Sequence, residues 1–145
     1  DGPSQIIIDV VRGQRGTPAE IAGEYAELLK SYNIHTVTGD RYAGSWCSDE
    51  FARHGIRYNF SQRSASDLYV DSLPAFNSGR VEIPGDDKLI TQLSTLERRT
   101  SRQGKDSITH RQGAHDDRAN VVCGLIAHAH KAKRTVKSKK IVGLI

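Results

Sequence analysis

The sequence predicts an α/β fold, and three consecutive segments carry that prediction. A β-branched run at residues 6–11 is typical of a strand, and it ends at Arg12-Gly13. Thr17-Pro18-Ala19-Glu20 is a capping box with proline at the first helical position, so a helix begins there. Residues 34–39 form a second β-rich run, and a strand, a helix and a strand in alternation are the pattern of α/β domains.

The later segments continue the alternation. We expect short helices or strands at residues 48–54 (helix), 56–60 (strand), 64–79 (helix), 80–83 (strand) and 86–96 (helix). Pro74 predicts a kink or an early stop in the third helix, which Ser64 or Ser66 caps. Residues 97–100 and 107–109 flank a glycine-containing turn and predict a hairpin. The last helix begins at Asp116 or Asp117 and runs to about Ala129.

Size and charge set the organisation of the chain. Its 145 residues fit one domain, and its formal net charge of +4 is compatible with a polyanionic partner. Lysines and arginines follow His130 without any acid, so we expect a domain over residues 1–130 and a basic C-terminal tail over 131–145. Such a tail is either solvated or a contact for phosphates.

Membrane, secretory and disulfide classes are not indicated. No apolar run approaches the roughly 18 residues of a membrane span. Residues 1–5 lack the basic and apolar stretches of a secretory signal, which predicts a cytosolic protein. Cys47 and Cys123 are far apart and show no CxxC spacing, so we expect two buried or half-buried free thiols rather than a disulfide or a zinc site.

Aspartates stand where predicted elements begin or end. Asp40 directly follows a strand, where ligand sites of open α/β sheets lie, although an aspartate there also serves as a turn residue. Asp116 and Asp117 stand at the amino end of the last helix, where they could cap it or complement its dipole. That positive helix end would also keep the two carboxylates ionised, as metal ligands must be.

Distant acids of this kind suit a two-metal site. Mg²⁺ prefers carboxylate and water oxygens, and two ions about 4 Å apart stabilise the attacking and leaving oxygens of a phosphodiester displacement. Asp40 and the Asp116–Asp117 pair supply candidate ligands from two places in the sequence.

A series of motifs resembles the nuclease domain of the large terminase subunit of tailed phages. The motifs occur in the family's order and extend roughly from Ile7 to Ala129: Val37-Thr38-Gly39-Asp40-Arg41-Tyr42-Ala43-Gly44 with Trp46, then residues 51–56, 66–69, 77–84 and 96–100, and finally Gly113-Ala114-His115-Asp116-Asp117 with Ala119-Asn120. Several ordered motifs are more specific than any one of them.

The resemblance implies a fold, an activity and a site. The implied fold is ribonuclease H-like, a central mixed β-sheet flanked by helices on both faces. The implied activity is endonucleolytic cutting of concatemeric double-stranded DNA during genome packaging, with two Mg²⁺ or Mn²⁺ ions, in the cytoplasm of a host cell that carries the virus or prophage. Portal protein and the small terminase subunit are the implied partners. By the motif match, Asp40 is the family's second aspartate and the Asp116–Asp117 pair holds the late one, with Asp117 favoured; His115 shapes the turn.

One departure from the family pattern affects the expected activity. The family's first aspartate lies in an Asp-Pro-Ser-Gly-like motif upstream of a segment that resembles residues 5–13, so we expect this chain to begin after it and to cut DNA weakly or not at all. Asp9 is a minor alternative for that ligand. No Gly-x-x-x-x-Gly-Lys-Ser/Thr loop occurs, so these residues do not contain the packaging ATPase.

Basic and aromatic residues beside the acids have two interpretations each. The hairpin region carries Arg98, Arg99, Arg102 and Lys105, which either grip DNA phosphates or form an ordinary charged surface. Arg41 contacts phosphate or balances the acids, and for Trp46 core packing is favoured over stacking on a base.

Two alternatives to the terminase nuclease stay open. The first is a catalytically incomplete ribonuclease H-like domain that binds DNA or docks to portal protein. The second is another ribonuclease H-like enzyme, such as a junction resolvase or an integrase.

Overall fold

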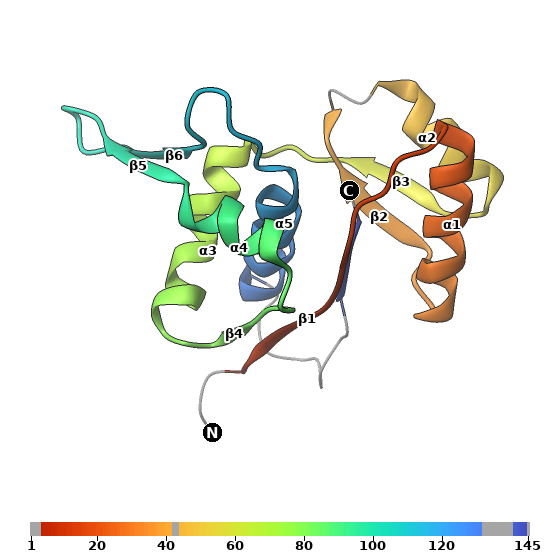
Figure 1. Ribbon diagram of the computed structural model, residues 1–145, viewed down its shortest axis with the longest axis horizontal. Helices are drawn as coiled ribbons and strands as arrows, with labels where there is room; N and C mark the ends of the chain where they lie inside the picture. Colours follow the sequence, from red (N-terminus) through yellow and green to blue (C-terminus); the bar gives the residue numbers. More distant parts are fainter. Residues whose placement is uncertain (1–3, 42–43, 132–140, 145) are drawn as a thin grey trace. The chain divides into compact units, whose positions relative to one another are not determined.

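The structure, a computed structural model, describes residues 4–41, 44–131 and 141–144. Its residues fall into two compact units. Unit 1 comprises residues 1–12 and 63–145, and unit 2 comprises residues 13–62. Figure 1 labels the helices and strands of both.

The core of unit 1 lies between a small parallel sheet and its helices. Strand β1 (Ile6–Arg12) is the central strand, between β4 (Val81–Glu82) and β7 (Ile141–Leu144). Ile6 and Ile8 point to the buried face, as the two-residue period of a strand requires, whereas Ile7 is half exposed. The buried pair packs against Leu89, Val122 and Ile126 of the helices. This contact fixes α5 on the sheet.

Three helices complete unit 1. They are α3 (Ala65–Asn77), α4 (Asp87–Ser94) and α5 (Asp117–Lys131). Tyr69 of α3 packs with Ala119 and Cys123 of α5 and with Ile108 in a second buried cluster. Ile108 belongs to the antiparallel hairpin of β5 (Glu97–Thr100) and β6 (Asp106–Thr109). Strand β6 packs on α3, and the turn of the hairpin extends away from the helices of this unit (Figure 1).

Unit 2 is a pair of parallel strands with two helices. Strand β2 (Thr36–Gly39) pairs in register with β3 (Arg57–Phe60), so that Gly39 lies beside Phe60. Helix α1 (Pro18–Ser31) carries the expected capping box at Thr17, and α2 (Ser45–Arg53) packs on it. Asn33, after the end of α1, has the left-handed conformation (φ 56°) that commonly terminates a helix.

Most of the predicted elements are confirmed, and the structure differs from the predictions in three places. Helix α3 continues through Pro74, because Ser64 caps it and the burial of Ala75 holds the last turn. Residues 141–144 of the expected tail form β7; residues 132–140 lie outside the described part. The described strands form three separate sheets, and the antiparallel pair is a hairpin of its own rather than part of one central mixed sheet.

Two further predictions concern the thiols and the membrane. Cys47 and Cys123 are both free and buried, as expected. No helix among the described residues is long and apolar enough to cross a bilayer.

Gly39→Ala is expected to destabilise unit 2 by about 1–3 kcal/mol, because a Cβ at residue 39 would collide with the Tyr58 hydroxyl and stand 2.6 Å from its Cζ. The matched control is Gly23→Ala in helix α1, where the nearest atom is 3.5 Å away. Helix propensity there favours alanine by about 0.5–1 kcal/mol. Thermal unfolding checks both variants, and equal midpoints for the two would contradict the close approach of Tyr58.

Candidate functional site

The predicted aspartate pair begins helix α5. The backbone carbonyl of Asp116 accepts the first helical hydrogen bond, from the amide of Asn120 at 2.7 Å. Asp117 is exposed in the first turn, where a negative charge is favourable beside the positive end of the helix dipole. Both acids therefore stand at the same helix end, as predicted.

The amide groups at this helix end are capped by Gln92 of α4. Its side-chain Oε1 accepts hydrogen bonds from the amides of Arg118 at 2.8 Å and Ala119 at 3.1 Å. These are the donors that an N-cap aspartate usually satisfies. The capping interpretation of the Asp116 side chain is therefore wrong, because a residue 24 positions earlier, which the sequence did not single out, performs that function.

The Asp116 carboxyl is instead held by a buried tyrosine. The Tyr69 hydroxyl donates to Asp116 Oδ2 at 2.6 Å, and Tyr69 is only 2% exposed. Burial, together with the charge of Asp116, raises the pKa of the Tyr69 hydroxyl, so that it keeps its proton and stays a donor. The side chain of Asp116 is 20% exposed, so part of the carboxylate is open to solvent.

His110 faces the other oxygen of Asp116. Its Nδ1 is 2.8 Å from the carbonyl oxygen of Arg111, which only accepts, so Nδ1 carries the hydrogen. In the neutral ring Nε2 then has a lone pair, and Nε2 is 3.9 Å from Asp116 Oδ1. His110 directly follows β6 and belongs to no recognisable motif, so the sequence alone does not point to it.

Asp40 and Arg41 lie in unit 2. Asp40 is exposed directly after β2, and its backbone carbonyl accepts a hydrogen bond from the Tyr58 hydroxyl at 3.2 Å. Burial, and then the neighbouring Cys47 and Asp40, raise the pKa of Tyr58 to about 12. Arg41 donates to Gln62 Oε1 at 2.8 Å.

Other predicted residues have mixed outcomes. Trp46 is 45% exposed, so the core-packing prediction is wrong: α2 buries Cys47 and Phe51, and the residue one position earlier faces outward. Asp9 lies on the exposed face of β1. His115 is exposed beside a turn in which Gly113 has a φ of 78°.

The structure brings together only part of the predicted metal site. Asp116 and Asp117 share one helix end in unit 1, while Asp40 belongs to unit 2, so the convergence of the three acids stays a prediction. Within the described ranges, no cluster of three or more histidine, cysteine, aspartate or glutamate side chains suited to a metal ion occurs. The oxygens of Asp116 and Asp117 are nevertheless the ligand type that hard divalent cations take.

Comparisons with solved structures decide the fold. The large terminase nuclease of thermophilic phage G20c matches with a TM-score of 0.63 and 20% identity over 85% of this chain and 66% of that chain. The nuclease domain of Thermus phage P74-26 matches with a TM-score of 0.61 and 19% identity, over 87% and 67%. The chain has the fold of a large terminase nuclease domain. This confirms, at the level of the fold, the resemblance seen in the motifs.

Further matches agree with this terminase fold. The large terminase of bacteriophage HK97 matches with a TM-score of 0.61 and 14% identity, over 81% of this chain and 26% of that chain. Structures of the G20c nuclease with bound cobalt and with bound magnesium each match with a TM-score of 0.59, at 18% and 19% identity. This chain thus spans about two thirds of the nuclease chains that it matches and a quarter of the HK97 protein. No family model and no curated protein sequence matches it.

The basic hairpin is partly neutralised by its own acids. Arg98 pairs with Asp106, and Arg99 lies 3.5 Å from Glu97, which also accepts from Arg111 at 2.8 Å. Arg102 and Lys105 are exposed at and beside the tip. These last two are therefore the hairpin cations best placed to meet a polyanion.

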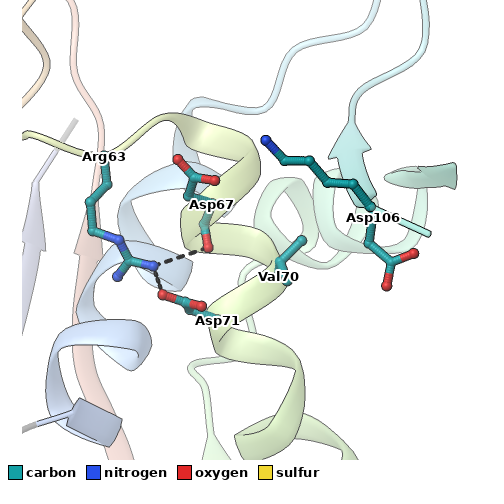
Figure 2. A pocket seen from close by; sticks show the side chains of 6 residues that line it. Arg63, Asp67, Val70, Asp71 and Asp106 are labelled. Carbon is teal, nitrogen blue, oxygen red and sulfur yellow. Dashed lines mark hydrogen bonds and ion pairs between the residues drawn. The ribbon is translucent and has the colours of Figure 1, made fainter. Parts of the chain in front are cut away.

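A shallow pocket of about 370 Å³ lies between α3 and the hairpin (Figure 2). Its acids already have partners: the Asp67 carboxylate accepts from the amide and hydroxyl of Ser64, the N-cap of α3. Asp71 pairs with Arg63, and Asp106 pairs with Arg98. None of the predicted aspartates lines it. The pocket is therefore distinct from the candidate metal ligands.

Gln92→Ala is expected to lower stability by about 0.5–2 kcal/mol, because two amides at the start of α5 lose their acceptor. Gln103→Ala, in the exposed turn of the hairpin, is the matched control and should leave the unfolding midpoint unchanged. Thermal denaturation of both variants is the measurement. A Gln92 variant as stable as the Gln103 variant would show that α5 is capped by another group.

Proposed function

We propose that this chain is a divalent-metal-dependent DNA endonuclease domain of a viral large terminase, with a ribonuclease H-like fold. The observation that carries the proposal is the start of α5, where Gln92 takes over capping and leaves the carboxylates of Asp116 and Asp117 for another function. The terminase fold and the magnesium- and cobalt-bound structures of the G20c nuclease support this assignment.

In the proposed site, Asp40, Asp116 and Asp117 hold Mg²⁺ or Mn²⁺, two ions in all. When bound, the ions would activate the attacking water and stabilise the leaving oxygen of a phosphodiester. Arg41 and the hairpin residues Arg98, Arg99, Arg102 and Lys105 would bind DNA phosphates and position the duplex. The substrate would be concatemeric viral DNA in the host cytoplasm, with portal protein and the small terminase subunit as partners.

Asp40→Asn, Asp116→Asn and Asp117→Asn should each reduce Mg²⁺- or Mn²⁺-dependent nicking of supercoiled plasmid by about 100-fold or more, since each removes a charged ligand. The matched control is Asp87→Asn, an exposed first-turn acid of helix α4, which should cut normally.

Circular dichroism establishes that each variant folds. A folded Asp40→Asn variant that cuts like the wild type would overturn the assignment of that residue. DNA binding that persists in a chain with no affinity for Mn²⁺ would favour the non-catalytic DNA-binding alternative. Comparison of branched with linear DNA separates a terminase nuclease from a junction resolvase.

Arg102→Ala and Lys105→Ala should weaken DNA binding independently of sequence and lower the slope of log K against log salt by about one per lost phosphate contact. Lys88→Ala, an exposed cation of the same unit on α4, is the control and should leave the slope unchanged. Fluorescence anisotropy at several salt concentrations measures the slopes. Equal slopes for all four proteins would exclude the hairpin tip from the DNA interface.

A further inference from the structure

Tyr69 joins the buried core of unit 1 to the candidate metal ligand. Its ring packs with Ile108, Ala119 and Cys123, and its hydroxyl donates to Asp116 Oδ2 at 2.6 Å. The two residues are 47 positions apart, so the fold of the chain makes this contact rather than local sequence. The ring is therefore held by packing while the hydroxyl holds the carboxylate.

This single hydrogen bond restricts the carboxylate strongly. An aspartate side chain has two rotatable bonds, and at a helix start it usually turns back to the free amides. Gln92 of α4 already accepts the hydrogen bonds of those amides. The Tyr69 hydroxyl of α3 donates to Oδ2 and holds the carboxylate in place. The second oxygen, Oδ1, is left facing His110 Nε2 at 3.9 Å.

We propose that Tyr69 is a positioning residue for divalent-cation binding: by donating to Oδ2 of Asp116 it presents Oδ1 of that carboxylate to the ion. The inference rests on the proposed function and adds a residue to it. A neutral hydroxyl is suited to the task, because it orients the carboxylate without cancelling the negative charge that attracts the cation. Hydrogen-bonding partners that orient metal ligands typically contribute about 10–100-fold in metal affinity.

The competing explanation is that the contact is only structural: a buried tyrosine hydroxyl requires a hydrogen-bond acceptor, and Asp116 supplies it. Under that explanation, its loss would change stability and leave metal binding intact. Tyr69→Phe separates the two, since it keeps the ring and removes one oxygen. Ser72→Ala is the matched control: Ser72 is a buried hydroxyl on the same helix and donates at 2.8 Å to the carbonyl of Tyr69, not to Asp116.

The experiment measures Mn²⁺ affinity of the 145-residue chain by titration calorimetry and by the Mn²⁺ electron paramagnetic resonance signal. Tyr69→Phe should raise the Kd for Mn²⁺ about 10–100-fold, and Ser72→Ala should leave it unchanged. Thermal unfolding of each protein reports the structural cost separately. Equal affinities for Tyr69→Phe and wild type, or equal losses in both variants, would overturn the inference while the proposed function survives.

A second measurement keeps both the ring and the hydroxyl of residue 69. 3-Fluorotyrosine placed at residue 69 should show a ¹⁹F shift that saturates with the same Kd as the Mg²⁺ titration of the chain. A resonance that does not move while Mg²⁺ binds would overturn the positioning role. A wild-type chain that binds neither Mg²⁺ nor Mn²⁺ at millimolar concentration would overturn the proposed function and this inference together.

Discussion

The candidate site depends on how the first turn of α5 is satisfied. Every helix begins with amides that lack an intrahelical acceptor, and aspartate is among the residues that most often supply one. Here the acceptor comes from Gln92 on a neighbouring helix, so the two aspartates of the turn are not needed for capping. Stability and the proposed chemistry are thereby assigned to different side chains.

Packing in unit 1 keeps this arrangement in place. Val122 and Ile126 of α5 pack with Ile6 and Ile8 of β1, and α5 also lies along α3, from which Tyr69 reaches Asp116. Arg118, in the first turn, pairs with Asp86, which in turn caps α4 through Leu89. The start of α5 is thus connected to both neighbouring helices, so a carboxylate there has a fixed position and direction.

Local patterns in the sequence predicted the elements well, because capping and periodicity are local properties. Thr17 and Ser64 form capping boxes, and Asn33 is left-handed, as their types suggest. The same local rules failed at α5, since Asp116 at an N-terminus resembles an N-cap and only the fold brings Gln92 to that position. The contacts of Tyr69 and His110 with Asp116 could not be predicted for the same reason. Tyr69 is 47 residues from Asp116 in sequence, and His110 is separated from it by a turn that contains no motif.

The charges around Asp116 argue for a cation as its partner. Arg118 and Arg111 are near in sequence and would be expected to neutralise the aspartate pair, yet Arg118 pairs with Asp86 and Arg111 with Glu97. Among the ion pairs within the described residues, none joins Asp116 or Asp117 to a lysine or arginine. The polar donor that reaches Asp116 is the neutral hydroxyl of Tyr69. His110 Nε2, 3.9 Å from Asp116 Oδ1, is the basic group nearest this carboxylate among the printed ion pairs of the described residues. A divalent ion bound there would gain oxygen ligands and offset the adjacent negative charges.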